Sequence, residues 1–366
     1  MMTKNKHPLS LYVHVPFCNH ICFYCDFSHV LTNPKTIQDW LSALKREYEE
    51  KKIAHDLKTI YIGGGTPSAL DVDTLEAFLS LFDSHIKEIE EYTIEVNPES
   101  ITKEKVECFL RHGINRISMG MQTSNDALLK EIGRTHTFEQ TKQAMRLLKE
   151  VGFTNISLDL MYSLPKQTME DLVASVHEAI KLEPTHISIY SLTIEENTVF
   201  GKKGVKPLEG DLEADMYFKI LELLPQYGYQ QYEISNFSLP GYESKHNLCY
   251  WNYEDFYGLG CGASGKENNI RYDKPSVLNA YLKNPLACTS IEESKEEQTF
   301  NAFMMGLRKK EGIYLPSFEQ TDIQSLFGER INDLIHEGLL ERNQDYLRCT
   351  KEGLPILNTI LVRLLD

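Results

Sequence analysis

The stretch Cys18-Asn-His-Ile-Cys22-Phe-Tyr-Cys25 places three cysteines close together in the spacing C-x3-C-x2-C. Thiolates are soft ligands, and cysteines grouped this tightly are typical of iron–sulfur clusters. A structural zinc site needs four protein ligands, and no fourth Cys or His follows at zinc-finger spacing. The pattern predicts a [4Fe–4S] cluster on Cys18, Cys22 and Cys25 that leaves one iron open to another ligand. A zinc ion or metal-free thiols are the alternatives.

Composition narrows the class of protein around this stretch. The chain has 366 residues, which suggests about two domains, and its net charge is −15. An acidic balance argues against nucleic acid as a partner and against a basic membrane anchor. No apolar run is long enough to span a bilayer, and His14 and Pro16 interrupt the first apolar stretch, which argues against a signal peptide. The other five cysteines are scattered, so we expect a reduced, cytoplasmic protein.

The first ~230 residues alternate strand-like and helix-like patterns at roughly the βαβ period. One helix has clear boundaries, because Thr137-Phe-Glu-Gln140 reads as a capping box and Gly152 follows the last apolar position. About six units are too few for a closed eight-stranded barrel, so we predict an α/β fold with a partial, open βα barrel. The predicted strands are Leu9–Val15, Thr59–Ile62, Tyr92–Val96, Arg116–Met119, Asn155–Leu160 and His186–Leu192.

The pattern changes near residue 230, which divides the chain into a core of residues 1–230 and a smaller domain of residues 231–366. Two helices are predicted at Ser294–Leu307 and Phe327–Glu337, followed by two short strands from Gly338. Helix, helix and hairpin indicate an α+β, winged-helix-like end. The acidic balance argues against DNA binding by this end.

Further residues that are suited to binding a ligand follow the predicted strands. Gly63-Gly-Gly-Thr-Pro67 comes directly after the second strand, where glycines let a backbone approach a ligand closely; a tight βα turn is the alternative. Four polar residues lie at or near later strand ends: Glu95, Gln122, Arg134 and Asp159. Ligands of βα folds collect at the carboxyl ends of the strands. Carboxylates and amides suit ribose hydroxyls, and an arginine suits a carboxylate.

Taken in order, these motifs resemble the radical S-adenosylmethionine (SAM) superfamily, and within it the family of oxygen-independent coproporphyrinogen III oxidases. The resemblance covers nearly the whole chain. It rests on Tyr12-Val-His-Val-Pro-Phe-Cys, Gly63-Gly-Gly-Thr-Pro-Ser, Glu95-Val-Asn-Pro-Glu, Arg116-Ile-Ser-Met-Gly-Met-Gln, Gly133-Arg-Thr-His and Asp159-Leu-Met-Tyr-Ser-Leu-Pro. It implies that SAM takes the open iron of the cluster. It also implies a set of residues lining SAM: Tyr12, Tyr24, Gly64, Gly65, Thr66, Glu95, Gln122, Arg134 and Asp159.

Departures from the oxidase pattern make oxidase activity doubtful. The oxidases usually carry a further cysteine two residues after the third, where this chain has Phe27. They also carry an N-terminal extension over the active site, whereas the first strand here is expected near residue 9. Ser163 replaces a glycine common in the last motif, a change that we expect to be tolerated.

One additional motif points to another branch of the same family. His246-Asn-Leu-Cys-Tyr-Trp251 is similar to the H-N-x-x-Y-W motif of the HemW-type haem chaperones. Histidine is a common axial ligand of haem iron, Cys249 or Tyr250 offers another, and Tyr250 and Trp251 provide flat apolar surface. The resemblance thus implies a haem site at His246, Cys249, Tyr250 and Trp251, with His246 favoured as ligand. A packed aromatic segment with a hydrogen-bonded histidine is the alternative.

We therefore expect a cytoplasmic haem chaperone that binds a [4Fe–4S] cluster, SAM and haem. Its implied partners are apo-haemoproteins that accept haem, including membrane-bound respiratory enzymes through which it would meet the membrane. The rival is anaerobic conversion of coproporphyrinogen III to protoporphyrinogen IX, and a third hypothesis is a radical SAM enzyme acting on another tetrapyrrole.

Overall fold

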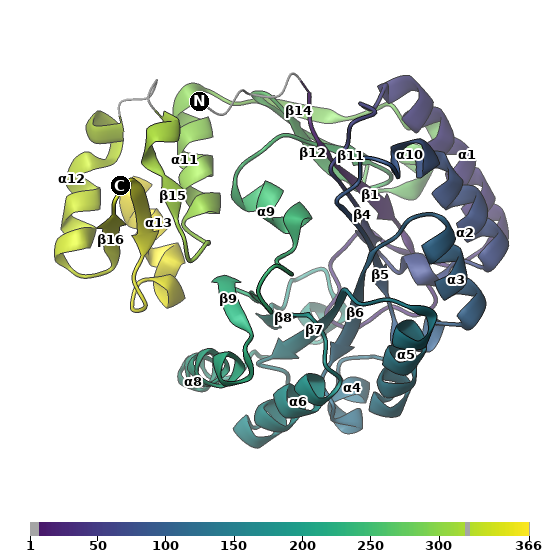
Figure 1. The fold of residues 1–366 in the computed structure, drawn as a ribbon, viewed down its shortest axis with the longest axis horizontal. Coiled ribbons are helices and arrows are strands. Elements are labelled where there is room, and N and C mark those ends of the chain that lie inside the picture. The colour runs from purple at the N-terminus through teal and green to yellow at the C-terminus, as the bar shows by residue number, and fades with distance from the viewer. Residues whose placement is uncertain (1–6, 319–322, 366) are drawn as a thin grey trace.

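The computed structural model of the chain describes residues 7–318 and 323–365, and an open twelve-stranded sheet dominates it. The strand order is β14-β13-β12-β11-β1-β4-β5-β6-β7-β8-β10-β9, and the sheet curves around a hollow as a partial barrel (Figure 1). The open barrel predicted from sequence is therefore confirmed. The central run of parallel strands is β11 (Phe256–Leu259), β1 (Ser10–Val15), β4 (Thr59–Gly64), β5 (Glu91–Val96), β6 (Arg116–Gln122), β7 (Ile156–Tyr162) and β8 (His186–Ser191).

Helices pack on the convex side of this sheet (Figure 1). Each strand turns apolar side chains toward them, such as Ile60, Ile94 and Leu158, which are fully buried in one continuous core. The predicted capping box is present on α5, where Thr137 and Gln140 exchange hydrogen bonds and Gly152 ends the helix with φ of 118°. The helices of this part are α1 (Pro34–Lys51), α2 (Val72–Leu79), α3 (Lys103–Arg111), α4 (Asp126–Glu131), α5 (Phe138–Val151), α6 (Met169–Lys181), α7 (Val199–Lys202) and α8 (Gly210–Leu223).

Residues 230–292 extend the sheet at both of its edges, which the sequence pattern did not reveal. β10 (Asn236–Ser238) pairs with β8 and β9 (Gln230–Glu233) follows it; β11 pairs with β1, and the antiparallel β12, β13 and β14 continue outward. Between them the chain forms α9 (Lys245–Trp251) on the concave side of the sheet (Figure 1). The division at residue 230 stays a prediction. The remaining elements are β12 (Ser264–Glu267), β13 (Ile270–Asp273), α10 (Leu278–Lys283) and β14 (Thr289–Glu292).

The C-terminal part has a hydrophobic core of its own, built around Phe303, Ile331, Leu347 and Ile360. Three helices surround a small antiparallel sheet in the order β15-β17-β16, in agreement with the predicted winged-helix-like end. Among the described residues, no helix is long and apolar enough to cross a membrane; the cellular location stays a prediction. The elements are α11 (Lys295–Gly306), β15 (Ile313–Tyr314), α12 (Ile323–His336), β16 (Leu340–Asn343), β17 (Tyr346–Cys349) and α13 (Leu357–Leu365).

A buried ion pair fastens α1 to the segment that follows β11. Glu47 has no exposed side-chain surface, and one of its oxygens lies 2.6 Å from Nζ of Lys274. Its other oxygen accepts hydrogen bonds from the Tyr281 hydroxyl at 2.7 Å and the Gly260 N–H at 3.0 Å. Gly260 has φ of 95° and passes so close to the carbonyl of His14 that a Cβ would lie 2.4 Å from it. The pair thus holds a crowded turn against β1.

We expect Lys274→Met to lower the free energy of unfolding by about 3–5 kcal/mol, because it leaves the Glu47 carboxylate buried without a countercharge. The double variant Glu47→Gln/Lys274→Met should recover part of that loss. Urea unfolding measures both. The control is Lys245→Met, which breaks an exposed pair with Glu90 and should cost no more than about 1 kcal/mol. Unfolding of Lys274→Met at the wild-type urea concentration would contradict a structural role for the pair.

Candidate functional site

The cysteine loop leaves β1 and opens onto a cavity of about 290 Å³. Cys18 is buried, Cys22 and Cys25 are half-buried, and all three are free thiols that line this cavity. The ends of the loop are held where β2 (Phe17–Cys18) pairs with β3 (Val30–Leu31), and its middle is held by the Phe23 N–H, which donates to the Ile132 carbonyl at 3.0 Å. Burial raises the pKa of Cys18, and it raises that of Cys25 to about 12. A metal would therefore displace protons from these thiols on binding.

The cavity gathers most of the residues predicted from sequence. It is bounded by the three cysteines and by Tyr24, Gly64, Gly65, Thr66, Glu95, Gln122, Arg134 and Asp159. Tyr12 is not among its lining residues; its hydroxyl instead lies 3.0 Å from Nδ1 of His14. Soft thiols at one end of a cavity with carboxylates and a guanidinium along its walls are the donor set that a cluster and a zwitterionic cofactor require. The residues present therefore fit the [4Fe–4S] cluster and SAM.

The glycine motif binds the end of β4 to the cysteine loop. The Gly65 N–H donates to the Val15 carbonyl at 2.8 Å, and the Thr66 N–H donates to the Phe17 carbonyl at 2.7 Å. A Cβ on Gly65 would lie 2.8 Å from that Phe17 oxygen, and Gly64 has φ of 109°. The glycines thus allow a close approach between two segments of the chain itself. The Thr66 hydroxyl also donates to the Cys18 sulfur at 3.5 Å.

Glu95 is a carboxyl group held on the cavity wall by β5. It accepts a hydrogen bond from the Tyr61 hydroxyl at 2.8 Å and another from the Gly64 N–H at 3.1 Å. Burial and the nearby Asp159 raise its pKa to about 7, although the hydrogen bond from Tyr61 acts in the opposite direction. The Glu95 side chain therefore changes charge near neutral pH.

Arg134 and Gln122 occupy the wall next to the cysteine loop. The guanidinium donates to the Asn97 side chain at 2.7 Å and to the Tyr24 hydroxyl at 2.9 Å. Gln122 ends β6 at a register shift and has φ of 63°, a conformation that is uncommon outside glycine. Such bulges re-aim a side chain at the end of a strand, and here Gln122 lines the cavity.

Sequence reasoning missed part of the wall, and Arg116 is the clearest omission. It is only 1% exposed, its Nε has no hydrogen-bond partner, and it lines the cavity beside Asp159, which accepts from Ser118 at 3.0 Å. The signal was present as alternation, because side chains two apart on a strand share a face. The lining residues of β6 follow that rule: Arg116, Ser118, Gly120 and Gln122. The other missed lining residues include Tyr61, Asn97, Ser188, Tyr190 and Asn247.

Ser163 stands where the sequence resemblance implies a glycine, and its backbone has a conformation that suits glycine. Its φ is 61°, in the left-handed region where glycine is favoured. The Ser163 hydroxyl donates to Glu213 at 3.2 Å, which ties this turn to α8.

The predicted haem residues lie on α9 and are not among the residues that line the cavity. His246 has no exposed surface; its Nδ1 is 2.8 Å from the Thr59 hydroxyl and its Nε2 is 2.7 Å from the Tyr250 hydroxyl. Burial and the nearby Arg116 lower the pKa of His246 to about 3, so the imidazole is neutral. Its ring also stacks on Tyr61 with centroids 5.2 Å apart. This is the packed, hydrogen-bonded arrangement that the sequence left open as the alternative.

The rest of the motif faces different neighbours. Cys249 is buried and its sulfur donates to the Asp255 carbonyl, and the Tyr250 ring packs edge-on against Phe256. The Trp251 ring is covered by the Arg308 guanidinium, 4.4 Å from its centroid. Of α9, Asn247 is the residue that lines the cavity. A haem site at these four residues stays a prediction.

Two family models match the chain: the radical SAM superfamily over residues 12–179 and the HemN C-terminal domain over residues 294–356. Curated relatives that match almost the whole chain bear the name haem chaperone HemW. The protein from Lactococcus lactis is 41% identical over 98% of this chain and 97% of its own length. Those from Bacillus subtilis and Escherichia coli are 35% and 33% identical, covering 96% and 97% of this chain and 97% of each relative.

Among solved structures, coproporphyrinogen III oxidase (HemN) from Escherichia coli has a TM-score of 0.85. It covers 98% of this chain and 90% of its own chain at 22% identity. This likeness establishes a common fold for both parts of the chain.

The raised pKa of Glu95 predicts a specific pH dependence of stability. Between about pH 4.5 and 7 the folded chain keeps a proton that the unfolded chain has released, so the free energy of unfolding falls as pH rises. The full effect is about 3 kcal/mol, and Glu95→Gln should remove it. Urea unfolding between about pH 5 and pH 8 compares the two slopes. Replacing the exposed Glu50 on α1 by Gln is the control; a Glu95→Gln slope equal to that of wild type would contradict the prediction.

Proposed function

Because the chain belongs to the HemW family within the radical SAM superfamily, we propose that it is a haem chaperone that binds haem and passes it to apo-haemoproteins such as respiratory enzymes. The observation that carries this proposal is identity of 33–41% to proteins named haem chaperone HemW over almost the whole of both chains. Acceptors in the respiratory chain would bring it to the membrane through the partner.

Cys18, Cys22 and Cys25 would hold the [4Fe–4S] cluster in this proposal, and the cavity beside them would hold SAM. When bound, the cluster supplies single electrons to SAM. Arg134 is a fixed cation next to the cysteine loop and would pair with the SAM carboxylate. Glu95 on β5 and Asp159 on β7 are hydrogen-bond acceptors on the cavity wall and would receive the polar hydrogens of the ligand. Arg134, Glu95 and Asp159 would together orient SAM and keep water from it.

Arg134→Gln should weaken SAM binding by about tenfold or more, because one charge-assisted hydrogen bond to a carboxylate is lost. Equilibrium dialysis of labelled SAM against the cluster-loaded chain measures the change. The iron content per chain should stay at the wild-type value, which separates an effect on SAM from loss of the cluster. Arg146→Gln on the exposed face of α5 is the control. Unchanged affinity in Arg134→Gln would remove this residue from the proposed site.

Haem binding at α9 requires part of the helix to move, because both nitrogens of His246 are already hydrogen-bonded. The helix is short, and its N-terminus is held by Glu91, which accepts from the Ser244 hydroxyl and from the N–H groups of Lys245 and His246. Its other end meets α11 of the C-terminal part. Haem would therefore enter between the barrel and the C-terminal part as this segment opens.

An anaerobic haemin titration followed by absorbance tests the proposal directly. The wild-type chain should show a saturable Soret shift near one haem per chain, and His246→Gln should weaken it by about tenfold or more because an axial ligand is lost. Cys249→Ser tests the second candidate ligand. His177→Gln replaces a histidine on α6 and should bind like wild type.

No saturable haem binding by wild type would overturn the chaperone proposal. Saturable binding that is indifferent to both His246 and Cys249 would keep the proposal and move the ligand elsewhere. If wild type binds no haem, the oxidase alternative would be assayed with coproporphyrinogen III and SAM. Only the fold favours it, and Phe27 lines the cavity at the position of the extra oxidase cysteine with 64% of its surface exposed.

A further inference from the structure

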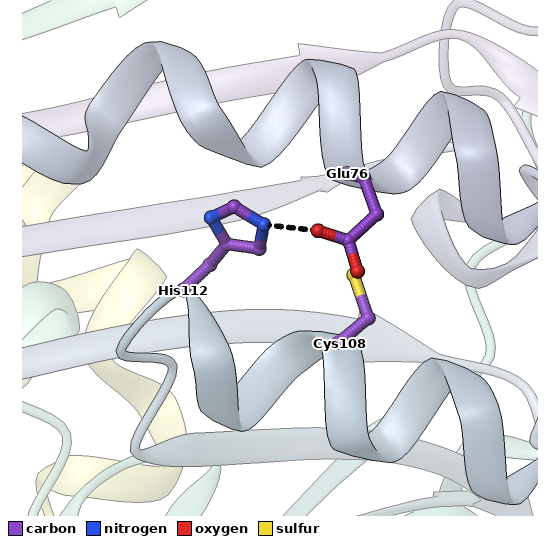
Figure 2. Close-up of side chains that lie close together, drawn as sticks. All are labelled: Glu76, Cys108 and His112. Atoms are coloured by element: carbon purple, nitrogen blue, oxygen red, sulfur yellow. Dashed lines mark hydrogen bonds and ion pairs between the residues drawn. The ribbon is translucent and has the colours of Figure 1, made fainter.

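A second group of metal-ligating side chains lies on the convex side of the barrel, between α2 and α3. It consists of Glu76 on α2 and of Cys108 and His112 on α3 and its C-terminal cap (Figure 2). One ligand atom from each residue lies within 4.8 Å of the other two. Cys108 and His112 are four residues apart, so the helix itself brings them to one face.

The three side chains point toward one another across the gap between the two helices (Figure 2). Nε2 of His112 lies 2.8 Å from one oxygen of Glu76, and the other oxygen pairs with Arg111. Cys108 has no exposed surface, His112 is 8% exposed and the Glu76 side chain is 36% exposed. Two of the candidate ligands, Cys108 and His112, are therefore buried, and the third, the Glu76 carboxylate, is partly exposed to solvent.

His112 also has the support that metal-binding histidines usually have. Its Nδ1 lies 2.7 Å from an oxygen of Asp83, which fixes the ring with Nε2 directed at Glu76 and Cys108. A carboxylate on the far nitrogen orients a metal-ligating imidazole and increases its basicity. Arg111 similarly holds the Glu76 carboxylate in place through the oxygen that a metal would not need.

We propose that Glu76, Cys108 and His112 bind a divalent ion of the zinc class. One thiolate, one imidazole and one carboxylate are the ligand types of zinc, whereas calcium and magnesium prefer oxygen alone. A tetrahedral zinc ion places its ligand atoms about 3–4 Å apart, and the three ligand atoms here all lie within 4.8 Å of one another. A water molecule on the exposed side would complete the coordination.

The bound ion would cross-link α2 and α3. These helices support the strands that carry the glycine motif and Glu95. It shares no residue with the cavity or with α9. The rival account is a plain charge cluster, in which a protonated His112 bridges Glu76 and Asp83 and Cys108 is an ordinary buried thiol. The two accounts differ in whether zinc binding depends on the thiol and on the imidazole.

The test uses the full chain with its cluster loaded, dialysed against a chelator-buffered low concentration of zinc chloride. Zinc and iron are counted per chain by mass spectrometry. Wild type should hold about one zinc that Cys108→Ser and His112→Gln lack, with equal iron in all three. X-ray absorption at the zinc edge should show one sulfur neighbour. Asp83→Asn, which keeps all three ligands, should weaken zinc binding by about 10- to 100-fold.

The matched control is Cys288→Ser, which removes an exposed cysteine elsewhere and should leave the zinc count unchanged. Because Cys108 is buried, circular dichroism checks that its variant folds, and His112→Gln and Asp83→Asn carry the test if it does not. Equal zinc in wild type and the folded variants, or zinc without a sulfur neighbour, would overturn the proposal. Haem and SAM binding should be the same with and without zinc, so failure of this site is distinguishable from failure of the chaperone function.

Discussion

The two-residue period of the parallel strands is the constraint on which the rest of the structure depends. In each central strand one face must pack against helices, and in this chain that face is aliphatic, as Ile60 and Ile94 show. The alternate positions carry polar side chains, and they meet inside the open barrel. Arg116, Glu95 and Asp159 are gathered by this geometry alone, although they come from three different strands. The cavity is therefore a consequence of strand pairing, to which the loops add the thiols.

The cysteine loop and the glycine motif are positioned by backbone contacts of the same kind. Gly65 and Thr66 donate to carbonyls at the end of β1 and in β2, so the segment with Cys18 is joined to the segment that follows β4. Glu47 holds the turn at Gly260 against β1 from the other side. Contacts among three segments that are distant in sequence thus fix the position of the cysteine loop. The same contacts fix the directions of the thiols relative to Arg134.

The cysteines of this chain differ in what surrounds them, and the surroundings separate their roles. Cys18, Cys22 and Cys25 face a cavity lined by polar groups, which suits a cofactor. Cys108 faces an imidazole and a carboxylate on the far side of the sheet, which suits a single ion. The Cys249 sulfur, by contrast, donates to the Asp255 backbone carbonyl, and its neighbour His246 is enclosed by Thr59 and Tyr250. The same residue type therefore supports three different interpretations.

The sequence by itself determined the features that depend on near neighbours. The six strands, the capping box at Thr137 and the cysteine triad are local patterns, because period, capping and ligand spacing act over a few residues. The residues at the strand ends were predicted to converge for the same reason, since parallel strands share one carboxyl edge. The family resemblance also came from sequence, because its motifs are short and ordered.

Tertiary structure alone decided which distant segments pair. Nothing local in residues 256–259 indicates that β11 lies beside β1, or that α9 packs against β4. Arg116 and His246 became buried, and Glu76 was brought to Cys108, through contacts between segments far apart in the chain. Such contacts depend on the free energy of packing whole elements together, which no short pattern of residues records.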